Sequence, residues 1–362
     1  SPLWIFHSLV PMSDVPVTAW WLLAWVLALS PAPVGAVGAG IASAAAILTR
    51  PNIVPLTMVL ALFITVRSGV RRGVTYALTV LPVALLIASL NRYLYGSPIG
   101  TGYGALEDLF STRYFFVNVT NFWNWLIDLH TPAVLIGAWA LLTGRVKDAW
   151  WLVAFSLVLL GCYVFYLPFD NWTFLRFLMP ALPLLFLFGA SSCVALIERL
   201  PLSLRGAATF ALCTLVVFWF ITKSDSLRMF EISSGERRYV TVGEAMGRLV
   251  PADAVLFSMI HSGSVRLYGD RDSARWDLID PNRLDTTIAA IRERGRKPYF
   301  LLEDWEEPRV RARFAEVSAL GKLDWPPAAE YVGHAQVRLY SFDDRDRYLR
   351  GELVLPKMIP AE

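Results

Sequence analysis

Negative charge is nearly absent from the first part of the sequence. Asp14 is the only carboxylate among residues 1–106, and the next one is Glu107. A carboxylate beside a long apolar stretch is costly, so it is usually retained for a function or for a charged partner. The alternative is a helix cap, in which Ser13 or Asp14 accepts backbone N–H groups of a helix that starts at Val15-Pro16. The two roles are compatible.

Cysteines and the common nucleotide and hydrolase motifs are also scarce. The three cysteines all lie in apolar runs and no C-x-x-C pair occurs, which argues against disulfides and against a cysteine-ligated metal. The sequence contains no strand followed by G-x-G-x-x-G and no G-x-S-x-G elbow, so we expect neither a dinucleotide site nor an α/β-hydrolase. The net charge of +3 gives no indication of nucleic-acid binding.

Hydrophobic residues make up 56% of the 362 residues, which is typical of membrane proteins and not of soluble ones. Several apolar runs are shorter than the roughly 20 residues that cross a bilayer squarely, so some of them could pair as hairpins or broken helices. The chain begins with Ser1 and shows no signal peptide, and we therefore expect a fragment whose N-terminal spans are missing. We expect about eight spans, at residues 15–30, 34–49, 52–66, 73–90, 132–144, 149–167, 175–198 and 206–222.

Short basic loops determine the expected orientation. The tightest basic cluster lies at residues 67–72, and positively charged loops stay in the cytoplasm. Alternation of the spans then places the basic loops 145–147 and 199–205 inside as well. The sequence therefore predicts a multi-pass protein of the plasma (inner) membrane. Its outer face would carry Asp14, Arg50, loop 91–131, loop 168–174 and everything after Lys223.

The long outer loop 91–131 has two parts. It begins with a segment rich in glycine, which permits close approach of the backbone to a ligand, and this segment includes Tyr103. Residues 105–129 then mix aromatic and charged side chains, which predicts one or two amphipathic helices along the membrane interface. Such helices form either a lid packed on the bundle or a wall of a cavity that binds lipid or sugar.

The last part of the chain has a different character. Strands are expected at 254–259, 298–302 and 336–342 and helices at 240–249, 284–294 and 306–320, an alternation that suggests a small α/β domain with a mainly parallel sheet. His261 follows the first strand, at the edge where such sheets bind ligands, although it could simply cap the next helix. The expected fold is thus a polytopic α-helical membrane bundle (1–223) followed by a small extracytoplasmic α/β domain (224–362).

Two arginines are expected on the same face as Asp14. Arg50 lies in the turn Arg50-Pro51-Asn52, and Arg176 stands at the mouth of a span. The guanidinium fork suits phosphate recognition. Snorkelling toward lipid headgroups is the competing explanation for each arginine taken alone.

The order of these segments resembles a known family. The segments are Pro11-Met12-Ser13-Asp14, Leu48-Thr49-Arg50-Pro51-Asn52, the loop from Tyr95 to Gly104, and Arg176-Phe177-Leu178-Met179-Pro180, all followed by an outer α/β domain. In this order they resemble bacterial membrane glycosyltransferases of the C superfamily, in the branch related to protein O-mannosyltransferases and lipid A aminoarabinose transferases. The resemblance covers most of the chain.

The resemblance implies transfer of a sugar from a polyprenyl-phosphate donor to an envelope acceptor (lipid, glycan or protein) on the outer face of the membrane. Asp14 resembles the family's second acid, near the reaction centre, and is the catalytic candidate in this chain, whereas the principal catalytic aspartate would lie in a loop before Ser1. Arg50 and Arg176 would contact the donor phosphate. Tyr103 and His261 are further candidates for substrate contacts.

The sequence also bears on partners, cofactors and an alternative function. Membrane lipids are expected partners and nucleic acid is not. No cofactor is required and no metal ligands are assigned, although a divalent metal stays open because the family's second acid sometimes helps to bind one. The alternative function is a non-catalytic membrane protein whose outer α/β domain binds glycan or lipid.

Overall fold

The computed structural model of the chain describes residues 1–10, 12–102, 106–130, 137, 140, 146–333 and 335–360. The chain divides into two compact units, Ser1–Met229 and Phe230–Glu362. This division lies a few residues beyond the boundary expected after residue 223. Each unit is built from its own local sequence signals and has its own core.

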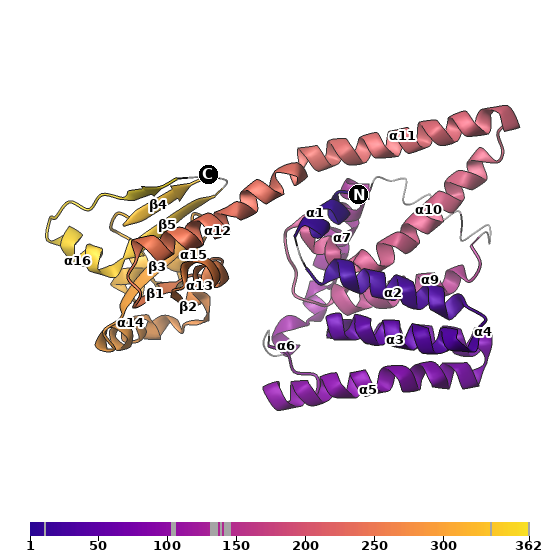
Figure 1. Cartoon of the computed structure of the whole chain (residues 1–362), viewed down its shortest axis with the longest axis horizontal. Helices are drawn as coiled ribbons and strands as arrows, with labels where there is room; N and C mark the ends of the chain where they lie inside the picture. The colour runs from indigo at the N-terminus through magenta and orange to yellow at the C-terminus, as the bar shows by residue number, and fades with distance from the viewer. Residues whose placement is uncertain are drawn as a thin grey trace. The chain divides into compact units, whose positions relative to one another are not determined.

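The first unit is mostly helical over its described residues. The 3-10 segments that bear on the site are η1 (Pro51–Ile53), η2 (Thr112–Tyr114) and η4 (Trp172–Ala181). The α-helices are α1 (Pro2–Leu9), α2 (Asp14–Leu29), α3 (Pro33–Thr49), α4 (Pro55–Ser68), α5 (Val70–Tyr95), α6 (Leu106–Leu109), α7 (Phe115–His130), α9 (Ala149–Val164), α10 (Leu182–Ile197) and α11 (Leu202–Ser226) (Figure 1).

Proline and glycine set the ends of the central helices. α3 and α4 begin at prolines, which fit the first helical turn because its N–H groups have no partner within the helix. α4 ends before Gly69, whose φ of +93° lets the chain reverse into α5. The result is a layer in which α2, α3 and α5 run side by side (Figure 1).

Small residues and aromatic rings share the core of this unit. A Cβ atom at Gly40 of α3 would lie 2.6 Å from Thr79 Cβ of α5, so glycine is what permits these two helices to approach closely. Elsewhere in this core, the rings of Trp21 and Phe155 meet edge to face at 5.4 Å, and Trp25 packs on Phe63 at 5.0 Å. This core holds the ends of α2, α3 and α9 in fixed positions.

Three helices are long and apolar enough to cross a membrane among the described residues. They are α5, the continuous η4–α10 segment Trp172–Ile197, and α11; the pair α1–α2, bent by 114°, would make a fourth if it counts as one span. The helices α3, α4 and α9 are apolar but shorter. The expectation of about eight spans is therefore met only in part. The run expected at 132–144 lies almost entirely outside the described residues.

The second unit contains a mixed six-stranded sheet. Its strands are β1 (Ala254–Phe257), β2 (Asp272–Ala274), β3 (Lys297–Glu303), β4 (Ala329–Val332), β5 (Gln336–Ser341) and β6 (Lys357–Ile359), in the order β2-β1-β3-β5-β4-β6. The pairs β1–β2, β1–β3 and β4–β6 are parallel, whereas β3–β5 and β4–β5 are antiparallel. The last strand expected from the sequence thus runs against β3, and the sheet is mixed instead of mainly parallel.

Helices cover both faces of this sheet. Apolar residues of α12 (Ile232–Leu249) and α13 (Ser262–Gly269) pack with Leu256, Leu301 and Leu339 on one face. Residues of α14 (Leu284–Glu293) and α15 (Glu306–Phe314) pack with the neighbouring strand residues, such as Phe257 and Phe300, on the other. A final helix, α16 (Phe342–Leu349), follows β5. The alternation of side chains along each strand therefore fills two cores and confirms a small α/β unit.

Candidate functional site

Asp14 is the first residue of α2 and is buried, with 1% of its surface exposed. The helix has no side-chain cap: the hydrogen bonds expected from Ser13 or Asp14 to its first N–H groups are not formed. The capping alternative is therefore wrong. The carboxylate still lies in the first helical turn, where the helix dipole favours negative charge. Its two oxygens instead face arginines from elsewhere in the unit.

Arg50 and Arg176 converge on Asp14. Arg50 ends α3, just before Pro51 starts η1, and its Nη1 forms an ion pair with Asp14 Oδ1. Arg176 lies in the middle of η4, and its Nε is 3.9 Å from Asp14 Oδ2. The two arginine side chains are 14% and 17% exposed. The structure therefore joins the three residues that the sequence placed on one face.

The two guanidinium groups share an aromatic support. Phe177 lies 5.2 Å from Arg50 Cζ and 5.6 Å from Arg176 Cζ. Tyr163 and Phe174 flank the pair, at 5.8 Å from Arg50 and 4.8 Å from Arg176 respectively. Rings at these distances attract a guanidinium and fix the plane in which it lies. The cations are thus held by aromatic faces as well as by one carboxylate.

Hydrogen bonds fix the aromatic support in turn. Tyr163 stacks on Phe177 with ring centres 4.6 Å apart, and its hydroxyl accepts a hydrogen bond of 3.0 Å from Asn52 Nδ2. Asn118 Nδ2 donates to the carbonyls of Val164 and Tyr166, at 3.1 and 2.6 Å, where α9 has ended. The Val164 carbonyl belongs to the last turn of α9, where carbonyl groups lack a partner within the helix, so Asn118 supplies one and holds the residues around Tyr163 in place.

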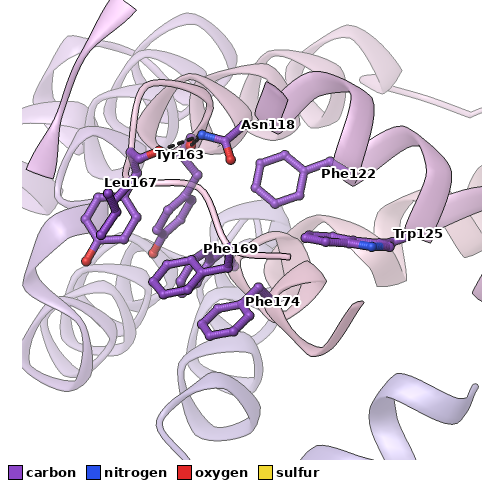
Figure 2. A pocket seen from close by; sticks show the side chains of 9 residues that line it. Asn118, Phe122, Trp125, Tyr163, Leu167, Phe169 and Phe174 are labelled. Carbon is purple, nitrogen blue, oxygen red and sulfur yellow. Dashed lines mark hydrogen bonds between the residues drawn. The ribbon is translucent and has the colours of Figure 1, made fainter. Parts of the chain in front are cut away.

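Aromatic side chains also line a narrow, closely packed crevice next to these residues. Figure 2 shows Phe122 and Trp125 facing Phe169 and Phe174 across it, with Asn118 and Tyr163 at one end. The lining residues are Asn118, Phe122, Trp125, Tyr163, Tyr166, Leu167, Phe169, Phe174 and Phe177. Since Tyr163, Phe174 and Phe177 belong to both features, the crevice adjoins the charged cluster.

His7 of α1 is part of the same neighbourhood. Its side chain is buried, with 2% exposed, and its Nε2 lies 3.2 Å from the carbonyl oxygen of Thr173 in η4. Asp14, Arg50 and Arg176 all lie within electrostatic range of its imidazole. The sequence alone does not single out His7, because a lone histidine in an apolar helix carries no spacing signal.

The charges of this cluster indicate what it could bind. Two guanidinium groups and one carboxylate leave a net charge of +1 when His7 is neutral. A partly buried net positive charge favours an anion, and two guanidinium forks suit a phosphate. No group of three or more His, Cys, Asp or Glu side chains that could hold a metal ion is found in the part of the chain that the structure describes. The cluster is therefore best suited to an anionic group.

His261 lies in the C-terminal unit. β1 and β3 are parallel, so their carboxyl ends meet at one edge, and His261 Nε2 is 3.1 Å from Oε1 of Glu303 there. Arg238 Nε and Trp305 Nε1 donate to the same carboxylate at 2.8 and 2.7 Å. His261 is fully buried and does not cap α13 with its side chain. These contacts favour a structural role for His261. Its partner is the Glu303 carboxylate and not, as expected, the start of the next helix.

The Glu303 carboxylate makes this unit sensitive to acid. Burial raises the pKa of Glu303, but the hydrogen bonds from His261, Arg238 and Trp305 outweigh burial and lower this pKa to about 2. A lowered pKa contributes stability that is present above the unfolded value and is lost as pH falls through the folded value. The shift corresponds to something on the order of 3 kcal/mol of unfolding free energy.

We expect the unfolding free energy of the second unit to exceed that of a Glu303→Gln variant at pH 6, and the difference to shrink between about pH 4.5 and about pH 2. Fluorine NMR of the full chain labelled with fluorotryptophan would report it, through the Trp276 and Trp305 signals during urea unfolding. A difference that is independent of pH would contradict this role of Glu303.

Tyr103, the remaining expected site residue, lies outside the described residues. The structure thus joins Asp14, Arg50 and Arg176, and it places His261 in a separate buried network of the second unit. Comparison with known proteins adds no family assignment, because no protein-family model, no curated protein and no solved structure matches this chain.

Proposed function

We propose that this chain is part of a membrane glycosyltransferase that moves a sugar from a polyprenyl-phosphate donor to an envelope acceptor. The observation that carries the proposal is the partly buried cluster of Asp14, Arg50 and Arg176, with its net positive charge and its aromatic support. Its position at the ends of apolar helices supports a ligand that is both anionic and lipid-linked. We also propose that the chain crosses the plasma (inner) membrane several times, with the cluster and the second unit on the outer side of that membrane.

The chemistry of such a transfer matches the cluster in charge. A phosphate that links a sugar to a prenyl chain carries one negative charge, and a second develops on the leaving oxygen as the bond to the sugar breaks. Preorganised guanidinium groups stabilise charge that develops in a transition state. Arg50 and Arg176 would hold the phosphate, and the proposal assigns to Asp14 the task of keeping both groups in place.

This assignment changes the expected role of Asp14. Both carboxylate oxygens of Asp14 are engaged by guanidinium groups, so neither is available to take a proton from an acceptor hydroxyl. It balances part of the positive charge and orients the two guanidinium groups toward a second anion. We therefore treat Asp14 as a positioning residue of the proposed site.

The proposal is tested with the full-length gene product in membranes. A polyprenyl-phosphate sugar labelled in the sugar is supplied together with extracted envelope acceptors, and membranes that lack the gene product are the control. Label that enters lipid, glycan or protein only when the gene product is present supports the proposal. Specific binding of the donor without transfer to any of the three acceptor classes would contradict it and favour a binding protein.

A further inference from the structure

Among the described residues, His7 and His130 each have a buried Nδ1 atom without a hydrogen-bond partner, and His7 is the one near the Asp14–Arg50–Arg176 cluster. A carbonyl oxygen can only accept, so the Nε2 atom that faces Thr173 O must carry a hydrogen. In a neutral imidazole the other nitrogen, Nδ1, then has no hydrogen and is an acceptor. This Nδ1 atom is buried and has no hydrogen-bond partner among the described residues. Buried polar atoms are normally paired, so an unpaired one at a candidate site calls for an explanation.

The surroundings of His7 suggest what the missing partner is. Asp14 at the start of α2, Arg50 at the end of α3 and Arg176 in η4 all lie within electrostatic range of the imidazole. Lys223 of α11, a helix that also contacts α1, is paired with Asp128 at 2.6 Å. The nearby cations suit the phosphate of a ligand, whereas an unprotonated Nδ1 atom suits a hydroxyl group.

We infer that His7 Nδ1 accepts a hydrogen bond from the acceptor hydroxyl and takes its proton during transfer, an inference that rests on the proposed function. The hydroxyl oxygen forms a bond to the anomeric carbon while the bond from that carbon to the phosphate oxygen breaks. The electron pair of the broken bond stays on the phosphate beside Arg50 and Arg176. The hydroxyl proton moves to Nδ1, and the resulting imidazolium later loses it to water.

The hydrogen bond to Thr173 prepares His7 for this task. It fixes the tautomer and the ring orientation, as second partners of catalytic histidines generally do. Thr173 lies in η4 together with Arg176, so the same segment positions both the base and one phosphate-binding group. Hydroxyl and phosphate would thus be held by side chains supported from a single turn of the chain.

Substitution of His7 by glutamine tests the inference, because the glutamine amide can still donate to Thr173 O but has no base at the Nδ1 position. Transfer by the full-length protein should lose about 100-fold or more in kcat, whereas the donor affinity changes little. The acidic limb of the pH–rate profile should also disappear. His7→Asn, which offers an acceptor but no base, should lose kcat as well.

A matched control is His130→Gln, since His130 is equally buried and its Nε2 faces Ser1 Oγ at 2.8 Å. This variant should transfer at the wild-type rate. If wild-type protein transfers sugar and His7→Gln keeps both the rate and the pH profile, the inference is wrong and the proposed function stands. If wild-type protein transfers no sugar, the proposed function itself fails. A raised KM with unchanged kcat would also overturn a role for His7 as the base.

Discussion

Replacement of Asp14 by asparagine should reduce sugar transfer by about 100-fold or more while the protein still inserts into membranes. The change leaves two guanidinium groups close together without the carboxylate that both of them face. Removing one partner of a buried ion pair costs about 3–5 kcal/mol, because the remaining charge is uncompensated. The arginines should therefore move apart, and the site for the donor phosphate should be lost. Transfer assays and equilibrium donor binding on the same membranes measure both effects.

Asp128→Asn is the matched control for this prediction. Asp128 also pairs with a cation in the first unit, Lys223, but the carboxylate is 57% exposed. Exposed ion pairs contribute at most about 1 kcal/mol, so this variant should transfer sugar nearly as well as wild type. Equal transfer by Asp14→Asn and wild type would contradict the role given to Asp14. Equal losses in the two variants would indicate a general effect of removing an ion pair.

Lysine substitutions at Arg50 and Arg176 should weaken donor binding even though they keep the charge. Lysine lacks the planar fork that binds phosphate through two parallel hydrogen bonds and that stacks on Phe177. We expect the donor Kd to rise about tenfold for each lysine variant and more for each alanine variant. Binding of a labelled polyprenyl-phosphate sugar to solubilised full-length protein measures these changes.

Arg113→Lys provides the comparison for the lysine variants. Arg113 also lies on an aromatic ring, 4.7 Å from the centre of Tyr114, but it does not pair with Asp14. Its replacement should leave the donor Kd unchanged. Donor binding that tolerates lysine at both Arg50 and Arg176 would show that only positive charge is needed, as for lipid headgroups, and would oppose a specific phosphate site.

The charged part of the candidate site could be predicted from the sequence because charge is rare there. Asp14 stands alone among many apolar residues, and Arg50 and Arg176 lie at the ends of apolar runs, so the sequence itself singles them out. Their convergence required only that the helix ends lie on the same side. The distances and the shared carboxylate required the structure.

The aromatic part of the site could not be predicted in this way. Tyr163 and Phe177 look like ordinary core residues of apolar segments, and nothing in their spacing indicates that guanidinium groups lie on them. His7 was overlooked for a related reason. Its importance comes from a hydrogen bond to Thr173, which is 166 residues away in sequence. Contacts of this kind depend on tertiary packing and leave no periodic pattern.

The strands of the second unit show where sequence patterns are strong and where they fail. β1, β3 and β5 are buried apolar segments and were expected. β2 has three residues and none fully buried, and β6 is an exposed segment of three residues with only Ile359 buried. Such short edge strands carry little hydrophobic signal, because they are defined by backbone pairing with a neighbouring strand and bury few side chains. The sequence also carries no sign of β4, which is antiparallel to β5, and so does not indicate that β5 runs against β3.

Photoaffinity labelling tests most directly whether the Asp14–Arg50–Arg176 cluster binds the donor. A polyprenyl-phosphate sugar with a photoreactive group next to the phosphate is irradiated with full-length protein in membranes, and the labelled peptides are sequenced. We expect label in peptides that contain residues 48–54 and 172–181, with competition by unlabelled donor and strong loss in the Arg176→Ala variant. Specific, competable label confined to other parts of the chain, such as the second unit, would contradict the central claim.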